Sequence, residues 1–340
     1  MPNKPIVGIT MGDAAGIGPE IILKAVDNNE ARIAANYLVY GSPQVMKRAA
    51  ASLKWKGSVL EVTSVAECRF GYGEIEVIPC RNVALKNCRI GEVSAECGDL
   101  AFLSIRRAID DARAGLIAAT ATAPINKEAL SRAGHNFAGH TEIYAHFTNT
   151  ADYTMMLMEG NLRVVHVSTH VSLRQAIDLV KMDRIVAVIK LVREALLGMG
   201  IKSPRIAVAG LNPHAGENGI FGREEIEEIA PAVVEAAELG AVGPFPPDTV
   251  FSHAAGGEYD AVVAMYHDQG HIPLKTLGFR YGGLEGPKIS GINITLGTPV
   301  IRCSVDHGTA FDRAGKGVAD ESSMVSAMVA AAAMARSKIK

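Results

Sequence analysis

The sequence predicts an α/β protein in which helices cover both faces of largely parallel sheets. Short apolar runs rich in Val, Ile and Ala alternate with helical patterns along the 340 residues, which is typical of layers built around a parallel sheet. The segments richest in polar, chemically useful residues mostly follow an apolar run directly. Loops after strands are where α/β folds bind ligands. The length fits two lobes or one large α/β domain.

The predicted strands share continuous apolar runs without polar alternation. They are 5–11, 37–41, 75–80, 116–123, 153–158, 163–168, 205–211, 261–266 and 293–304. The predicted helices are 98–114, 183–199, 223–239 and 322–340. Asp183 and Ser322 fit N-cap positions, and Gly240 fits the position just after a helix. We find no internal repeat and no low-complexity linker.

The composition excludes several classes of protein. A formal net charge of -2 provides no basic surface for nucleic acid. The first residues lack the charged head and long apolar stretch of a signal peptide, and the longest apolar run, 328–335, is far shorter than the ~20 residues of a membrane span. The five cysteines show no CxxC spacing, which favours reduced thiols. We therefore expect a soluble cytoplasmic protein.

The segment MGDAAGIGPE (11–20) contains a glycine loop. Gly12, Gly16 and Gly18 give G-x-x-x-G-x-G, whereas a Rossmann fold requires G-x-G-x-x-G. Pro19 suits the first turn of a helix whose backbone N–H groups can bind an anion. Taken alone, the loop is equally well explained as a plain glycine turn between a strand and a helix.

Two loops resemble the isopropylmalate and isocitrate dehydrogenases. GDAAGIGPE resembles the GDGIGPE that opens those enzymes, and HGTAFDRAGKGVAD (307–320) resembles their cofactor loop HGSAPDIAGKG. This resemblance implies two αβα lobes of that type, not a Rossmann fold. It also implies that NAD contacts residues of both loops, namely Gly12, Asp13, Gly308 and Asp312.

Several histidines lie in polar loops after predicted strands: His170, His214, His267 and His271. Three neutral imidazoles with one open position can hold a divalent cation that binds hydroxyl and carboxylate oxygens. No pair has the spacing of a zinc-binding helix, so the residues alone leave open that these are hydrogen-bonded structural histidines. His135, His146, His166, His253 and His307 are most simply explained as structural.

The motifs together closely resemble the 4-hydroxythreonine-4-phosphate dehydrogenase family. The matching stretches cover nearly the full length and are MGDAAGIGPE, TAPINKEAL, GHTE, GLNPHAGENG, FGREE, GPFPPDTVF, YHDQG and GINITLGTPVIRCSVDHGTA. The resemblance implies an NAD-dependent enzyme with one divalent cation (Zn, Mg, Mn or Co) on His170, His214 and His267. It also implies a homodimer whose active site lies in a cleft at the dimer interface, with ligands from both subunits. We expect a terminal lobe of 1–128 plus 300–340 and a central lobe of 129–299.

The same resemblance places the substrate contacts on His140, Thr141, Lys275, Asn293 and Arg302. Lys275 and Arg302 supply the positive charge that a phosphate and a carboxylate require. Asp248 and Asp268 can orient imidazoles or take part in proton transfer, although Asp248 can equally well cap a turn. The general base stays open between Lys275, Asp248 and water.

Three departures from the usual family pattern resemble its second branch. They are Ala14 in place of a proline, the extra His271, and the long segment RYGGLEGPKISGIN (280–293). Members of that branch oxidise C3 of 4-phospho-D-threonate or 4-phospho-D-erythronate and decarboxylate the product to dihydroxyacetone phosphate and CO2. Tyr281, Glu285 and Lys288 either line or merely cover the substrate near C2, and His271 is an alternative to His267 as a cation ligand.

Three other functions stay open. One is oxidation of 4-phosphohydroxy-L-threonine to 3-amino-2-oxopropyl phosphate in pyridoxal phosphate biosynthesis. Another is an NAD-dependent dehydrogenase of a cyclic carboxylated diol, which needs no phosphate contact. The third is a non-catalytic protein that binds a phosphorylated metabolite, which predicts a loss of charged or ligating residues that this sequence does not show.

Overall fold

The computed structural model describes residues 4–82, 84–280 and 288–338. The chain forms two compact units: unit 1 is Met1–Thr150 with Thr298–Lys340, and unit 2 is Ala151–Gly297. The first boundary therefore lies at 150 and not at the expected 128. Helices α5 (Lys127–Arg132) and α6 (His140–Thr148) belong to unit 1 because their apolar side chains join Ile105 and Ile109, from the helix Ala95–Arg113, in one buried cluster.

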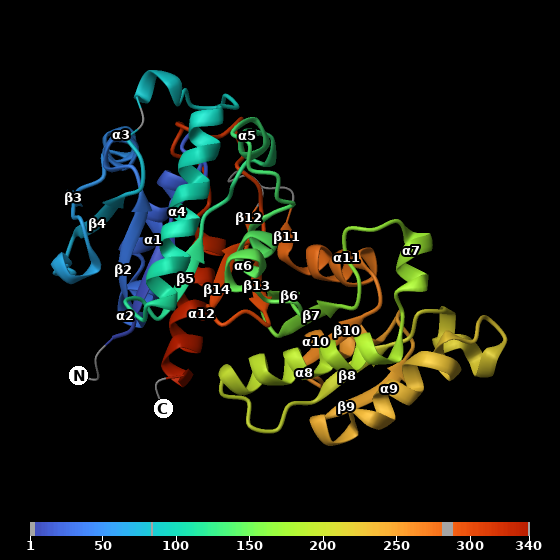
Figure 1. Ribbon diagram of the computed structural model, residues 1–340. Helices are drawn as coiled ribbons and strands as arrows, with labels where there is room; N and C mark the ends of the chain where they lie inside the picture. Colours follow the sequence, from blue (N-terminus) through green and yellow to red (C-terminus); the bar gives the residue numbers. More distant parts are fainter. Residues whose placement is uncertain (1–3, 83, 281–287, 339–340) are drawn as a thin grey trace. The chain divides into compact units, whose positions relative to one another are not determined.

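Unit 1 is built on a parallel sheet. Its strands lie in the order β3 (Ser58–Glu61), β4 (Glu74–Pro79), β2 (Asn36–Gly41), β1 (Ile6–Thr10), β5 (Ala119–Thr122) and β14 (Arg302–Val305), and each paired neighbour runs parallel. Helix α4 (Ala95–Arg113) packs against β1, β2 and β5, while α12 (Ser322–Lys338) packs against β1, β5 and β14 (Figure 1). The other helices of this unit are α1 (Gly18–Asp27), α2 (Asn29–Ala34) and α3 (Pro43–Leu53), with the short 3-10 turns η1 (Val65–Glu67) and η2 (Leu85–Asn87).

Unit 2 has a mixed sheet. Its strands lie in the order β13 (Ile292–Leu296), β6 (Thr154–Glu159), β7 (Leu162–His166), β10 (Ala261–Ala264), β8 (Ile206–Ala209) and β9 (Ala241–Phe245). Only β6 runs antiparallel to its neighbours, while β7, β10, β8 and β9 are parallel. The helices are α7 (Leu173–Asp178), α8 (Met182–Gly198), α9 (Ala230–Glu235), α10 (Val250–Ala255) and α11 (His267–Gly278), with the turns η3 (Pro213–Gly219), η4 (Glu225–Ile229) and η5 (Ala237–Leu239). A separate hairpin pairs β11 (Phe279–Arg280) with β12 (Lys288–Ile289).

Some expected elements are divided. The expected strand 293–304 is two strands, β13 and β14, because Gly297 adopts φ +92°, a conformation that ends a strand. The expected helix 223–239 is helical over most of its length but changes type: the π-helical turn η4 is followed directly by α9 and then by the 3-10 turn η5. Pro231, near the start of α9, cannot donate the hydrogen bond of a regular α-helix. Lys181, not Asp183, is the N-cap of α8, whereas Gly240 ends its helix as predicted, with φ +89°.

Three residues of the 280–293 segment were expected to line or cover the substrate. Tyr281 and Glu285 lie outside the described residues, and Lys288 is the first residue of β12. Across the described part of the chain, no helix combines the length and apolar character needed to cross a bilayer.

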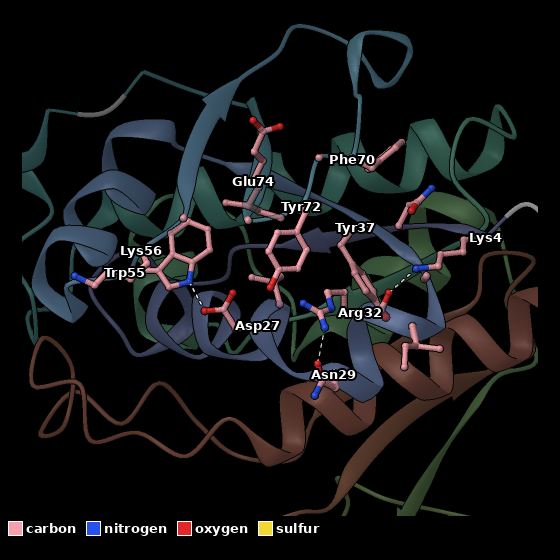
Figure 2. A pocket seen from close by; sticks show the side chains of 18 residues that line it. Lys4, Asp27, Asn29, Arg32, Tyr37, Trp55, Lys56, Phe70, Tyr72 and Glu74 are labelled. Carbon is pink, nitrogen blue, oxygen red and sulfur yellow. Dashed lines mark hydrogen bonds between the residues drawn. The ribbon is translucent and has the colours of Figure 1, made fainter.

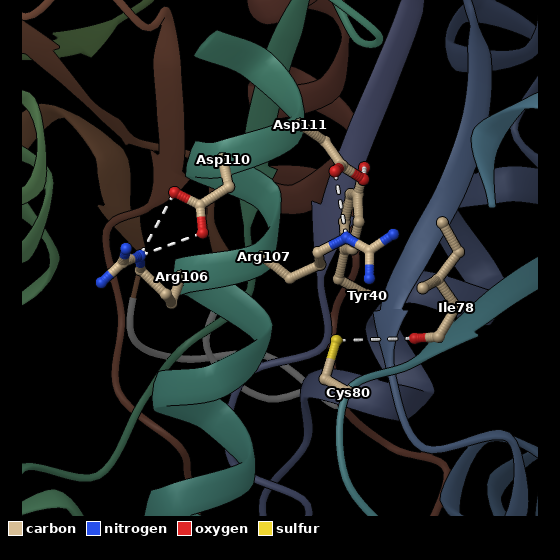
Figure 3. Close-up of polar contacts among 7 residues, drawn as sticks. All are labelled: Tyr40, Ile78, Cys80, Arg106, Arg107, Asp110 and Asp111. Carbon is tan, nitrogen blue, oxygen red and sulfur yellow. Dashed lines mark hydrogen bonds and ion pairs between the residues drawn. The ribbon is translucent and has the colours of Figure 1, made fainter. Parts of the chain in front are cut away.

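A buried polar network attaches α4 to the sheet of unit 1. The hydroxyl of Tyr40 on β2 donates to Asp111 Oδ2 at 2.8 Å, and Arg107 Nε donates to Asp111 Oδ1 at 3.0 Å (Figure 3). Tyr40 and Asp111 are both buried. Burial raises the pKa of Tyr40, so its hydroxyl stays a protonated donor. One residue earlier along α4, Arg106 and Asp110 form a similar pair that is exposed to solvent.

We predict that Tyr40→Phe lowers the free energy of unfolding by about 1.5–3 kcal/mol, because it removes a buried hydrogen bond to a carboxylate. The matched control is Arg106→Ala, which breaks the exposed pair and should cost less than about 1 kcal/mol. Urea unfolding followed by circular dichroism measures both. Equal shifts for the two variants would contradict the importance of the buried network.

Candidate functional site

Three neighbouring strands of unit 2 place the candidate cation ligands at one edge of the sheet. Strand β10 lies between β7 and β8 and is parallel to both. His170 follows β7, His267 follows β10, and His214 follows β8. The carboxyl ends of parallel strands share an edge. The three loops therefore start side by side, although the histidines are far apart in the sequence.

His267 has a fixed ring orientation. It begins α11, and its Nδ1 lies 2.6 Å from Asp268 Oδ1. A carboxylate at Nδ1 favours the tautomer with its proton on that atom and leaves the Nε2 lone pair for a cation, the common arrangement of metal-binding imidazoles. The hydrogen bond from His267 also lowers the pKa of Asp268. This geometry fits an orienting role for Asp268.

His170 and His267 lie close enough together to contribute to one cation site. Their ring centroids are 5.9 Å apart, while metal–nitrogen bonds of about 2.0–2.1 Å put two imidazole centroids in a tetrahedral site roughly 5 Å apart. The side chain of His170 is exposed and can turn. Among the residues that the structure describes, no group of three or more His, Cys, Asp or Glu is placed to hold an ion. Of the three candidate ligands, the structure brings His170 and His267 together and does not add His214 to them within the described part of one chain.

Two more histidines, His271 and His166, lie close to His267. His271 stacks on His267 with centroids 3.6 Å apart, and its Nδ1 lies 3.0 Å from the His267 carbonyl oxygen. Burial lowers the pKa of His271 to about 4, so its ring is neutral. His166 is buried 4.8 Å from His271, and within the described residues neither of its ring nitrogens has a hydrogen-bond partner. A side chain at Gly270 would collide with His166 Nε2, which explains the glycine there.

His214 stands in a turn of unusual backbone conformation. The five consecutive residues 214–218 all have φ between 44° and 80°. A left-handed conformation costs roughly 1–2 kcal/mol for each residue other than glycine, and Gly216 is the only glycine among the five. Local preference therefore cannot hold this turn, and contacts from outside it must do so. Nothing in the motif GLNPHAGENG predicted this conformation.

Gln269 links the loops that carry His214 and His267. Its Nε2 donates to the Gly210 carbonyl at 2.7 Å, and its Oε1 accepts from the Met265 backbone N–H at 2.6 Å. Gly210 directly follows β8, and Met265 directly follows β10. The buried amide of Gln269 therefore fixes the separation of these two strand ends. Gln269 is not among the predicted site residues, although it belongs to the YHDQG motif.

The other predicted residues of unit 2 lie around α11 and at the edge strand. Lys275 lines a cavity of about 680 Å³ together with His267 and His271. Asp248 is exposed and borders a cavity of about 630 Å³ that Asp268 also lines. Asn293 on β13 donates from Nδ2 to Met155 Sδ at 3.2 Å. Its Oδ1 is buried and accepts no hydrogen bond from any described residue, so it can accept one from a ligand.

Unit 1 gathers Arg302, His140 and Thr141. Arg302 begins β14 and is buried; its Nε and Nη2 donate to Thr122 Oγ1 at 3.2 and 3.1 Å, and its Nη1 lies 3.4 Å from Thr141 Oγ1. Burial lowers the pKa of Arg302 to about 10, which still leaves it charged at neutral pH. Burial, then the charge of Arg302, lowers the pKa of His140, so this imidazole is neutral. A buried guanidinium beside hydroxyls and a neutral imidazole is suited to bind a phosphate or a carboxylate.

The two candidate cofactor loops contact each other within unit 1. The carboxylate of Glu20 accepts hydrogen bonds from the backbone N–H groups of Gly315 and Gly317. The Ile17 N–H donates to the Thr309 carbonyl at 3.1 Å. Glu20, which is buried, therefore anchors the 307–317 segment to the start of α1. It is not among the predicted residues; its only signal is its position directly after the Gly18-Pro19 pair.

The four predicted cofactor residues differ in their surroundings. Gly12 has φ +72° and lies directly against the Pro124 carbonyl, where a side chain would not fit. Asp13 is buried, and burial raises its pKa to about 6 while its Oδ1 accepts from the Ala15 N–H at 2.8 Å. Gly308 and Asp312 are exposed. The structure brings the two loops together, which is a requirement for a shared ligand.

A cavity of about 710 Å³ in unit 1 contains none of the predicted residues. It lies at the amino ends of β2 and β4, where Trp55, Tyr72 and Arg32 surround it (Figure 2). The Trp55 indole N–H donates to Asp27 Oδ2 at 2.6 Å. The candidate loops of unit 1 follow the carboxyl ends of β1 and β14. This cavity is therefore at the opposite edge of the sheet from those loops.

The known proteins to which this chain is similar match it over most of its length. The family model described as pyridoxal phosphate biosynthetic protein PdxA matches residues 33–331. A D-threonate 4-phosphate dehydrogenase of Salmonella typhimurium is 48% identical, covering 94% of this chain and 95% of its own. The structure of a 4-hydroxythreonine-4-phosphate dehydrogenase from Klebsiella pneumoniae is 48% identical, with a TM-score of 0.84 and coverage of 98% and 100%. That of a terephthalate 1,2-cis-dihydrodiol dehydrogenase from Burkholderia xenovorans is 28% identical, with a TM-score of 0.65 and coverage of 95% and 98%.

We predict that Glu20→Ala releases the 307–317 segment, because two backbone N–H groups lose a charged acceptor, each interaction being worth about 1.5–3 kcal/mol. Amide hydrogen exchange at Gly315 and Gly317 should become at least tenfold faster. The control is Glu30→Ala, an exposed acidic residue at the start of α2. Unchanged exchange at both glycines in a folded Glu20→Ala protein would show that the carboxylate does not anchor the loop.

Proposed function

Because this chain belongs to the PdxA family, we propose that it is an NAD- and divalent-cation-dependent dehydrogenase of 4-phospho-D-threonate. Hydride leaves C3 for NAD while the hydroxyl proton passes to a base, which gives a 3-keto acid. The C1–C2 bond then breaks, C2 takes up a proton, and the products are dihydroxyacetone phosphate and CO2. 4-Phospho-D-erythronate is the alternative substrate of the same kind.

One observation favours 4-phospho-D-threonate over the alternative substrates. The Salmonella typhimurium relative, at 48% identity over almost the whole chain, has D-threonate 4-phosphate dehydrogenase as its name. The departures at Ala14, His271 and 280–293, which resemble the second branch of the family, support the same choice. Of these, His271 lies in the described site and stacks directly on a candidate cation ligand.

The buried charge of Arg302 suits an anionic end of the substrate. A guanidinium offers two parallel N–H donors to a phosphate or carboxylate, and Arg302 keeps its charge despite burial. His140 and Thr141 stand beside it at the start of α6 as additional hydrogen-bonding groups. Lys275 and Asn293, in unit 2, are the further substrate contacts of the proposal, and Lys275 and Asp248 are the candidates to take the hydroxyl proton.

We propose that His170 and His267 hold the cation, with His214 from a second copy of the chain completing the site in a homodimer. When bound, such a cation polarises the oxygen on C3, and NAD accepts the hydride. The hydrogen bond between His267 and Asp268 supports this assignment because it directs the His267 Nε2 lone pair away from the carboxylate. His271, which stacks on the His267 ring, keeps that ring in place.

For NAD, we propose the two loops that Glu20 anchors, with Gly12, Asp13, Gly308 and Asp312 as the contacts. The Glu20 contacts support this, because they join two segments that both resemble cofactor loops of the isopropylmalate and isocitrate dehydrogenases. From the resemblance of these two loops to those enzymes, we also propose that both units are of that αβα type.

Two alternatives each have an observation in their favour. The name of the Klebsiella pneumoniae structure favours oxidation of 4-phosphohydroxy-L-threonine. The structural likeness to a terephthalate dihydrodiol dehydrogenase favours a cyclic carboxylated diol, at lower identity. The first substrate differs from phosphothreonate at C2, an amine in place of a hydroxyl, and the second lacks a phosphate.

We predict NADH formation from 4-phospho-D-threonate with added Mg, Mn, Co or Zn, at a rate at least tenfold above that from 4-phosphohydroxy-L-threonine. 4-Phospho-D-erythronate and unphosphorylated D-threonate complete the comparison, and release of dihydroxyacetone phosphate is measured with a coupled reductase. Arg302→Met should raise KM by at least tenfold, because a buried charge for the anion is lost. Absence of NADH from all phosphorylated acids in the presence of each metal would refute the proposed reaction.

A further inference from the structure

The left-handed turn 214–218 is connected to one buried carboxylate, that of Glu225. Glu225 begins the π-helical turn η4 and is 3% exposed. Its Oε1 accepts hydrogen bonds from the backbone N–H groups of Leu211 and Asn212, both at 2.7 Å. Its Oε2 accepts from Asn212 Nδ2 at 2.9 Å. Three donors from the residues that lead into the turn therefore converge on a single side chain.

The backbone before the turn and within it packs closely around the same carboxylate. A side-chain carbon at Gly216 would lie 2.6 Å from Glu225 Oε2, and one at Gly210 would lie 3.2 Å from Oε1. Gly210 precedes the turn and Gly216 is its middle residue. The glycines therefore permit the chain to wrap around the carboxylate, with His214 between them.

We propose that Glu225 is a positioning residue that holds the left-handed turn and thereby sets the direction in which His214 projects. Residues forced into unfavourable backbone conformations persist only where their surroundings fix them, and they cluster at functional sites. Glu225 supplies the fixing contacts, while His214 supplies the function. This inference rests on the proposed function only in taking His214 as a cation ligand.

The arrangement differs from an ordinary surface acid pair. Glu227, two residues further along η4, is exposed and pairs with Arg223 Nε at 2.6 Å. Within the described part of the chain, the Glu227 carboxylate accepts its side-chain hydrogen bond from Arg223 and not from the turn. Glu227→Gln is therefore a matched control with the same chemical change, in the same short element, away from the turn.

The experiment uses Glu225→Gln in the full-length protein. The substitution keeps the size of the side chain but turns one oxygen into an N–H2 group, which must face either the backbone donors or Asn212 Nδ2. Amide exchange is measured at 211–219, and binding of Co²⁺ to the metal-free protein is measured by calorimetry. Exchange at Leu211 and Asn212 should become at least tenfold faster, and the Kd for Co²⁺ should rise 10- to 100-fold, the range for losing a residue that orients a ligand. Glu227→Gln should change neither by more than about twofold, as is usual for surface positions.

A second variant tests the backbone directly. Ala215 has φ +52°, a conformation that glycine adopts without steric cost. Added to Glu225→Gln, the substitution Ala215→Gly should restore at least a third of the lost Co²⁺ affinity on a logarithmic scale. Rescue by a residue that adds no contact would show that the carboxylate acts through the turn.

The outcomes separate the two proposals. If Glu225→Gln is folded and leaves both exchange and Kd within twofold of the parent, the positioning role is overturned. The role is also overturned if exchange quickens but Kd does not change while His214→Ala weakens Co²⁺ binding by more than tenfold. If His214→Ala leaves the Kd unchanged, the cation assignment of the proposed function fails, and the exchange data alone support or overturn the anchoring of the turn.

Discussion

Buried backbone N–H groups must have hydrogen-bond acceptors, and in this protein single carboxylates supply them in several of the candidate loops. A buried donor without a partner costs about 1–3 kcal/mol, so a loop that runs through the interior requires an acceptor at a defined point. Glu20 accepts from two glycines of the 307–317 segment, Glu225 accepts from Leu211 and Asn212, and Asp13 accepts from Ala15. The same pattern recurs away from any predicted site, where Glu76 accepts from Arg69 and Phe70. Within the described residues, each of these carboxylates therefore acts as an acceptor for main-chain N–H groups.

The parts of the molecule that could be predicted from its sequence are those with a strong local pattern of apolar residues. Strands β1, β2, β7 and β10 consist mainly of apolar residues because both of their faces are buried. Their sequences could therefore be recognised as strands. Strand β3 is missing from the prediction because it is largely exposed and carries no such run. The prediction of a single strand over 293–304 missed the turn at Gly297, because the residues on both sides of that turn are equally apolar.

The candidate site shows the same division. Residue type and position after a strand made His170, His214, His267 and His271 candidates, since parallel strands share an edge, and the family resemblance selected the first three. Glu225 and Gln269 were not predicted, because an acid in a charged helical pattern and an amide in a polar loop have no signal of their own. Their importance lies in backbone partners that are distant in space from any motif: Gln269 contacts Gly210 across 59 positions of sequence. Such partners become visible only once the strands are placed.

The single tryptophan of the chain has a consequence for how this protein can be observed. Trp55 is held by Asp27 at the amino-end cavity of unit 1, so intrinsic indole emission reports on that corner of one unit. Unit 2, with every candidate cation ligand, contains only tyrosines and phenylalanines as fluorophores. An unfolding curve followed by fluorescence that is excited where only tryptophan absorbs will therefore report the unfolding of unit 1 alone. Unit 2 could unfold earlier or later without altering the signal.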